Sequence, residues 1–249
     1  MGRRKRRQTK VLISLGRCGW DHHTVLLACR SARGGLAVRS AFLCGAAGAR
    51  QARARWKREE YPRIQALAKA EKASIWFRDE AGVRSDDHRG AAWAPVGETS
   101  VVRTTGARYG WNMVSAVSGR GDMRFMLTAK SVTARVFVEF LRRLITGAKQ
   151  PVFLIVGGRP SHRSSMVREF LGNHERRIRL FYLPPYLPVW NPDEQVWREV
   201  KSHGGARKAV ASNKELKQHV LRALRQLQRA PHKIRAFFRT PETAYASAA

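Results

Sequence analysis

The sequence is short of acidic residues. Its 249 residues include 18 Asp and Glu against 48 Lys and Arg, which gives a formal net charge of +30. An excess of positive charge this large indicates a polyanionic partner, and nucleic acid is the simplest one. The 43% hydrophobic content is nevertheless enough for a core, so the composition predicts a globular, nucleic-acid-binding protein.

Long apolar runs and paired cysteines are also missing. No stretch approaches the roughly twenty apolar residues that span a bilayer, and the run from Val11 to Gly16 is short for a signal peptide. We therefore expect an intracellular protein without a membrane anchor. The cysteines Cys18, Cys29 and Cys44 are odd in number and form no close pair, which argues against a disulfide framework.

Residues 1–54 differ in kind from the rest. They contain twelve Lys or Arg, one acid (Asp21) and no sustained helix or strand period, so we expect a basic, poorly ordered segment. Its candidate DNA-contacting arm consists of Arg3, Arg4, Lys5, Arg6 and Arg7. A solvated charge run, a nuclear-type address and a transit peptide remain alternatives for this segment. Its Cys and His residues (Cys18, His22, His23, Cys29) match no standard zinc-finger spacing.

Residues 55–249 have the pattern of one α/β domain. Apolar runs predict strands at 74–77, 111–118, 123–129, 152–156 and 178–183, with a hairpin turn at 119–122. Helical periodicity predicts helices within 58–73, at 131–147 with Gly147 as a C-terminal stop, at 162–174, from Asn191 and from the capping box at Ser212. The last helix should face the core with Leu216, Val220, Leu224 and Leu227. This order predicts a mixed sheet with helices on its faces.

Two acids lie where α/β sheets place their sites. Asp79 follows the strand predicted at 74–77, and Glu194 belongs to the "NPDE" run that opens a helix. An ordinary explanation exists for each, because acids are common in turns and Asn191 with Glu194 approximates a capping box. Glu194 nevertheless lies away from the core-facing Val196 and Val200, so its carboxylate is free to point into a cleft.

Five stretches in order resemble one family: "IWFRDEAGVRSD", "WAPVGET", "NMVSAV", "PVFLIVGGRPSHRS" and "LFYLPPYLPVWNPDEQVW". Together they are similar to the catalytic domain of DDE-type transposases of bacterial insertion sequences, in the mariner-related branch. The resemblance implies a ribonuclease-H-like fold, DNA (transposon ends and target) as partner, and a cytoplasmic, nucleoid-associated location in bacteria. Whether the protein forms a homodimer is left open.

The resemblance also implies a site in which three acids hold two Mg²⁺ or Mn²⁺ ions. The first and third would be Asp79 and Glu194, both catalytic residues and metal ligands, with Glu80 as a neighbour of the first. The second should end the strand at 152–156, and there this chain has Gly157. Glycine supplies no ligand, so we expect metal to bind weakly if at all. Conceivable stand-ins are Asp86, Asp87 and Asp193.

Further departures concern the loop before the third acid and the N-terminus. Leu187, Val189 and Trp190 replace the small polar residue, acid and Leu that the family usually has. No helix-turn-helix is recognisable in residues 1–54, although the resemblance implies one. The candidate DNA contacts outside the arm are Arg159, His162, Arg163 and Lys201.

Two functions follow from these expectations. The first is a transposase-like DNA-binding protein of the metal-dependent DDE class that is catalytically impaired by the loss of its second acid. The alternative is a non-catalytic DNA-binding remnant of a mobile element. An unrelated RNA-binding protein has little support, because the aromatic residues follow core patterns and do not form stacking motifs.

Overall fold

The computed structural model describes residues 51–85, 108–184, 188–203 and 210–247. The chain divides into two units, Met1–Cys44 and Gly45–Ala249, and all described residues belong to the second. The basic arm and the candidate zinc ligands therefore lie outside the described residues. The last four residues of the predicted N-terminal segment, 51–54, are helical in backbone.

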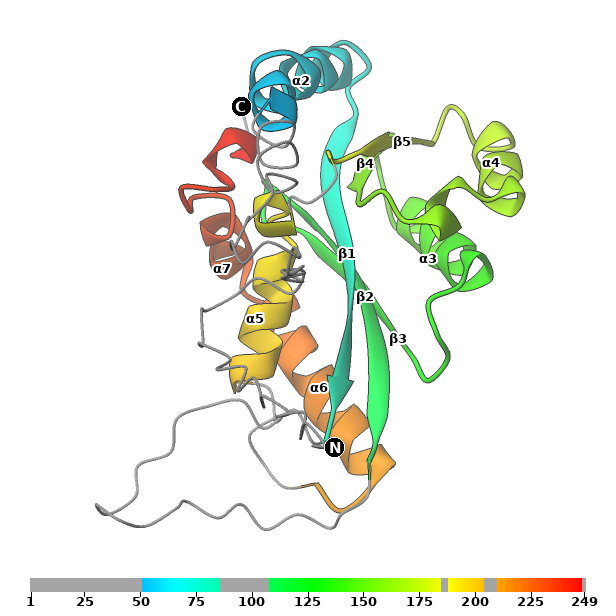
Figure 1. Ribbon diagram of the computed structural model, residues 1–249, viewed down its shortest axis with the longest axis vertical. Coiled ribbons are helices and arrows are strands. Elements are labelled where there is room, and N and C mark those ends of the chain that lie inside the picture. Colours follow the sequence, from blue (N-terminus) through cyan, green and yellow to red (C-terminus); the bar gives the residue numbers. More distant parts are fainter. Residues whose placement is uncertain (1–50, 86–107, 185–187, 204–209, 248–249) are drawn as a thin grey trace, which may run out of the picture. The chain divides into compact units, whose positions relative to one another are not determined.

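A five-stranded mixed sheet forms the centre of this unit, in the order β3-β2-β1-β4-β5 (Figure 1). The strands are β1 (Ser74–Arg84), β2 (Gly110–Ser118), β3 (Met123–Thr128), β4 (Val152–Val156) and β5 (Ile178–Tyr182). The first three pair antiparallel, whereas β1, β4 and β5 run parallel. All five predicted strands are confirmed, as is the hairpin turn, where Gly121 takes a φ of 96° that favours glycine.

The central strand β1 is longer than its sequence predicted. We expected a strand over 74–77 that ends at Asp79 and Glu80, but β1 continues through both to Arg84. Its pairing with β4 stops at Arg78 opposite Val156, while its pairing with β2 extends to Arg84. The second half of β1 is thus held by an antiparallel neighbour from a distant part of the sequence. Asp79 consequently lies where the parallel part of the sheet ends.

Helices cover both faces of the sheet (Figure 1). One face packs against α3 (Ala134–Thr146) and α4 (Ser165–Gly172), which together bury residues such as Phe137, Leu141 and Phe170. The other packs against α5 (Glu194–His203), α6 (Asn213–Gln228) and α7 (Pro231–Ala236), together with α2 (Tyr61–Ala70). The remaining short elements are the π-helix η1 (Trp56–Glu60) and the 3₁₀-helices η2 (Pro160–Arg163), η3 (Pro188–Trp190) and η4 (Ala244–Ala246).

The helix termini agree with their sequence signals at two places and differ at a third. α3 ends at its C-cap Gly147, the predicted stop, and the Ser212 hydroxyl accepts a hydrogen bond from the Glu215 N–H at the start of α6. The four residues predicted to face inward from α6 are all buried: Leu216, Val220, Leu224 and Leu227. The helix predicted from Asn191 begins as a regular α-helix only at Glu194, because its first turn makes i→i+3 backbone bonds.

Within the described residues, no helix is long and apolar enough to cross a membrane.

Candidate active site at the end of strand β4

Residue alternation along β1 separates two sets of charged side chains. Phe77 belongs to the core on the α5 side of the sheet, and Trp76 to the core on the α3 side. Since neighbouring side chains of a strand point to opposite faces, Asp79 faces α5, whereas Arg78 and Glu80 face α3. The first predicted acid is thereby directed towards the helix that carries the third.

Asp79 and Glu194 meet on this face. Both side chains are half-buried. The pKa of the Asp79 carboxyl is raised well above its usual value, first by burial and then by the charges of Glu194 and Asp193 and a hydrogen bond with Glu194. Two acids that lie 115 positions apart in the sequence are therefore neighbours in the fold.

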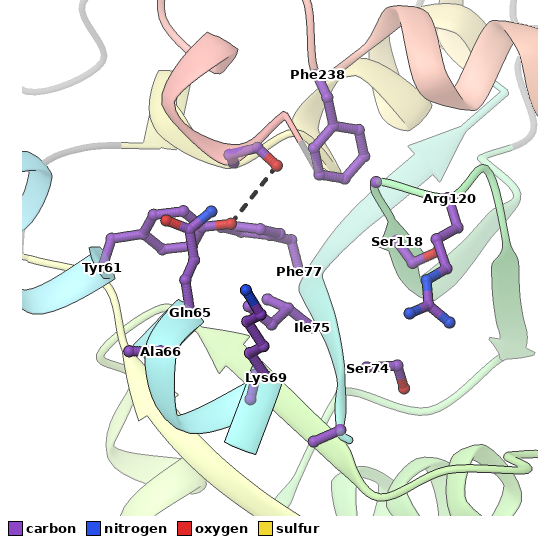
Figure 2. Close-up of a pocket in the computed structure, with 14 residues that line it drawn as sticks. Tyr61, Gln65, Ala66, Lys69, Ser74, Ile75, Phe77, Ser118, Arg120 and Phe238 are labelled. Carbon is purple, nitrogen blue, oxygen red and sulfur yellow. Dashed lines mark hydrogen bonds between the residues drawn. The ribbon is translucent and has the colours of Figure 1, made fainter. Parts of the chain in front are cut away.

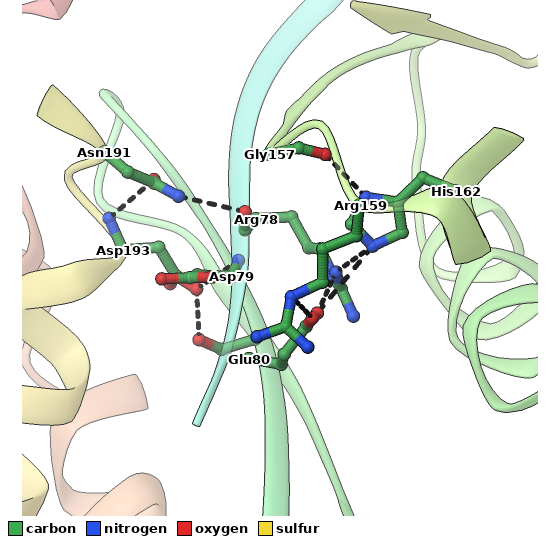
Figure 3. Close-up of polar contacts among 9 residues, drawn as sticks. Arg78, Asp79, Glu80, Gly157, Arg159, His162, Asn191 and Asp193 are labelled. Atoms are coloured by element: carbon green, nitrogen blue, oxygen red, sulfur yellow. Dashed lines mark hydrogen bonds and ion pairs between the residues drawn. The ribbon is translucent and has the colours of Figure 1, made fainter. Parts of the chain in front are cut away.

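Asp193 fixes the position of this pair. Its Oδ2 accepts a 2.8 Å hydrogen bond from the backbone N–H of Asp79 (Figure 3). The same oxygen accepts a 2.6 Å hydrogen bond from the Ser115 hydroxyl. Asp193 is 0% exposed, and burial raises its pKa to about 8, although the bonds from Ser115 and Asp79 act in the opposite direction. The start of α5 is thus tied to β1 and β2.

Asn191 adds a second tie. Its side-chain N–H donates a 3.0 Å bond to the Arg78 carbonyl, and its Oδ1 accepts from the Asp193 N–H at 3.1 Å (Figure 3). The ordinary capping explanation for the "NPDE" run is therefore partly right, since Asn191 does satisfy a backbone donor of the first turn. The same side chain also anchors Glu194 beside β1. Sequence reasoning missed these anchoring roles, because only tertiary contacts distinguish them from ordinary capping.

Gly157 directly follows β4 in the sequence and lies next to Asp79 in the sheet. The last β1–β4 pair joins Arg78 to Val156, so residue 157 comes beside Asp79 in the register. Strand alternation from Phe153 and Ile155, both in the core on the α5 side, places a side chain at 157 on the face of Asp79. A Cβ added at Gly157 would have no heavy atom within 4 Å. The site therefore has room for a carboxylate where glycine supplies none.

The acids present do not make a complete metal site. Among the residues that the structure describes, no group of three or more His, Cys, Asp or Glu is arranged to hold a metal ion. The stand-ins Asp86 and Asp87 lie outside the described residues. Asp193 lies close by, but its Oδ2 is already engaged by Asp79 and Ser115. Asp79 and Glu194 alone do not fit the requirement of a two-metal centre for several carboxylate ligands.

A buried charge cluster occupies the opposite face of β1. Arg78 is 1% exposed, and its guanidinium forms an ion pair with Glu80. Arg159 reaches the same carboxylate, with 2.6 Å between its Nε and Glu80 Oε1. Burial alone would raise the pKa of Glu80, but the neighbouring His162, Arg78 and Arg159 together hold it below its usual value. Desolvation lowers the pKa of Arg78 despite the acids around it.

The candidate DNA contacts occupy different environments. The side chains of Arg159, Arg163 and Lys201 are exposed, and Arg163 lies over the Tyr182 ring at 4.5 Å. His162 is 2% exposed, with both ring nitrogens in contact with other protein atoms. The structure therefore does not present this ring to a DNA phosphate.

The loop before Glu194 departs from the family pattern and is partly described. Leu187 lies outside the described residues, and Val189 is 50% exposed. Trp190 is buried, and its carbonyl accepts a 2.9 Å bond from the Tyr245 hydroxyl. Lys57 lies over its ring at 4.2 Å. The tryptophan thus contributes to packing with the C-terminal end of the chain.

A separate cavity of about 390 Å³ lies near the start of β1 (Figure 2). Its walls are largely apolar, with Tyr61, Phe77 and Phe238 among them, and Lys69 and Arg120 are its cations. No acid, histidine or cysteine lines it. This cavity offers no metal ligand of the usual kinds, so the acid pair remains the candidate catalytic site.

The strand order and the acids on its central strand define the class, a ribonuclease-H-like fold. The sequence model of the family described as "DDE superfamily endonuclease" matches residues 74–217, which is more than half of the chain. The chain therefore belongs to this family. No curated protein matches it by sequence.

Among solved structures, the chain is similar to the Mos1 mariner paired-end complex with Mn, at 15% identity and a TM-score of 0.53 over 90% of this chain and 68% of that one. It is also similar to the Mos1 strand transfer complex, at 17% identity and a TM-score of 0.51 over 79% of this chain and 63% of that one. The chain thus spans about two thirds of these Mos1 chains. At sequence identities this low, the structural similarity establishes the fold alone.

Proposed function

We propose that this protein is a transposase-like DNA-binding protein of the DDE strand-transfer class, derived from a bacterial insertion sequence, whose catalysis is impaired because Gly157 replaces the second acid. The observation that carries the proposal is the juxtaposition of Asp79, Glu194 and an empty side-chain position at 157. Family membership and the fold support the class. The net charge of +30 supports DNA as the partner.

The chemistry explains why one missing acid matters. DNA strand cleavage is an in-line displacement at phosphorus, in which one oxygen attacks and another leaves. Two divalent cations held by carboxylates would stabilise the attacking and leaving oxygens. Asp79 and Glu194 supply part of such a ligand set. Without a carboxylate at 157, one cation loses a ligand and its position is poorly defined.

The test is nicking of supercoiled DNA in Mg²⁺ or Mn²⁺ by the unsubstituted protein and by Gly157→Asp. We expect cleavage only by Gly157→Asp, and Asp79→Ala in the same background should abolish it. Gly158→Asp is the matched control, because a Cβ there also meets nothing within 4 Å, while residue 158 lies one position farther from the end of β4 at Val156.

Three other outcomes would contradict parts of this proposal. Cleavage by the unsubstituted protein that depends on Asp79 would show that another ligand replaces the missing acid, and catalytic impairment would be wrong. Equal cleavage by Gly157→Asp and Gly158→Asp would contradict the assigned position. No cleavage by any variant, together with salt-dependent DNA binding, would favour the alternative of a non-catalytic DNA-binding remnant.

A further inference from the structure

The backbone after β4 needs a restraint that its own sequence does not provide. Gly157 and Gly158 are adjacent, and glycine has the greatest backbone freedom of any residue. The pairing of β4 with β1 ends at Val156. A side chain at 157 could face Asp79 consistently only if another group held this segment.

His162 makes that contact. Its Nδ1 lies 2.7 Å from the Gly157 carbonyl oxygen, and its Nε2 lies 2.6 Å from Arg78 Nη1 (Figure 3). The ring packs against Phe137, with ring centroids 4.5 Å apart. The Tyr182 hydroxyl donates a 3.2 Å bond to the His162 carbonyl, so the backbone of the histidine is held as well.

These partners determine the proton position on the ring. A guanidinium group can only donate, so Nε2 has to accept from Arg78. A carbonyl oxygen can only accept, so Nδ1 has to carry the proton and donate to Gly157. Glu80 Oε2 is 3.8 Å from Nε2, which is too long for a hydrogen bond. The contacts therefore require a neutral imidazole with its proton on Nδ1.

Arg78 connects this contact to the third acid. Its guanidinium binds His162 and Glu80, while its backbone carbonyl accepts the 3.0 Å bond from Asn191, three residues before Glu194. Arg78 also directly precedes Asp79 in β1. One continuous chain of contacts thus joins position 157, Asp79 and the start of α5.

We propose that His162 is a positioning residue for the acid site: its neutral ring holds the backbone of residue 157 in place relative to Asp79 and Glu194. The inference rests on the proposed function in that it takes position 157 to belong to the acid site. It replaces the predicted contact of His162 with phosphate by a role inside the protein.

The first part of the test needs no activity. In the unsubstituted protein, long-range ¹H–¹⁵N spectra should show His162 protonated on Nδ1 only. His162→Ala should speed amide exchange at Leu183, whose N–H bonds to the Val156 carbonyl at 2.9 Å, by about tenfold, as expected from the loss of one hydrogen bond.

His174→Ala is the matched control. His174 also places Nδ1 against a backbone carbonyl, 2.8 Å from Phe170 O, and stacks on a phenylalanine. Its partner lies in α4, so its loss should leave exchange at Leu183 unchanged. A ring protonated on Nε2, or equal exchange at Leu183 in both variants, would overturn the proposal.

The second part measures nicking in the Gly157→Asp background. His162→Ala should lower the rate roughly tenfold or more, in the range seen when supporting residues around metal ligands are removed. His162→Asn should restore part of the rate, because its amide keeps one donor and one acceptor, and His174→Ala should have no effect. An unchanged rate in His162→Ala would contradict the positioning role. If Gly157→Asp does not nick while the spectra and exchange are as expected, the proposed function fails, and His162 holds the backbone of residue 157 without serving an acid site.

Discussion

The buried carboxyl group of Asp193 accepts a hydrogen bond from the backbone N–H of Asp79, with 2.8 Å between Oδ2 and N. This bond joins the residue before the third acid to the first acid. Because the Ser115 hydroxyl donates to the same oxygen at 2.6 Å, the helix start is tied to two strands at once. The geometry of the acid pair therefore depends on Asp193, a side chain whose ionised form is disfavoured by burial.

The raised pKa of Asp193 predicts a pH-dependent stability. The folded-state pKa is about 8 against an ordinary value of 3.8. Between these values the folded protein keeps a proton that the unfolded chain has lost. The free energy of unfolding should therefore fall as pH rises from about 4 to about 8, by up to about 1.4 kcal/mol per pH unit for this group.

Asp193→Asn should reduce this slope, because the amide keeps the acceptor oxygen and has no proton to lose. Urea unfolding at several pH values measures the difference between the two proteins. Equal slopes would show that Asp193 does not titrate in this way. Ser115→Ala, which removes one hydrogen bond and leaves the carboxyl group in place, is the control.

The Arg78–Glu80 pair predicts a strongly non-additive response to substitution. Arg78→Met should destabilise the fold by about 3 to 5 kcal/mol, because it leaves Glu80 buried without its main partner. Glu80→Leu should cost about as much for the converse reason. The double variant should regain most of the loss, since Arg159 is 62% exposed at its side chain and can return to water.

A double-mutant cycle from denaturant unfolding measures this coupling. Additive losses would show that the two residues stabilise the fold independently. The Glu139–Arg143 pair on α3, exposed by 40% and 62%, provides the comparison. Its removal should change stability little, because both side chains are exposed to water.

The exposed arginines after β4 should contribute to the salt dependence of DNA binding. If Arg159 and Arg163 contact phosphates, each substitution by alanine should reduce the slope of log K against log salt by about 0.9. Arg142 on α3 is the matched control: it pairs with Glu139 at 3.0 Å as Arg159 pairs with Glu80 at 2.6 Å, but it lies outside the loop after β4 and should change the slope little. Fluorescence anisotropy over a salt series measures the slopes. Equal effects of all three substitutions would rule out a phosphate contact specific to this loop.

The sequence alone determined the sheet class and most of the elements. Five apolar runs predicted five strands, and the inward-facing residues of α6 were predicted individually. These features depend on local alternation and periodicity, which side-chain burial imposes on strands and helices regardless of their neighbours. The motif resemblance likewise identified the family, and it named Asp79 and Glu194, the two acids that the fold brings together.

Tertiary structure decided what local pattern does not encode. β1 extends to Arg84 because β2 pairs with it, although its sequence predicted an end near Asp79 and Glu80. His162 is an interior residue because Gly157 and Arg78 converge on its ring, whereas its place in a basic loop suggested contact with DNA. Asp193 anchors the site through partners 78 and 114 positions away. Such roles arise only when distant segments meet, because a hydrogen bond depends on the position of both partners.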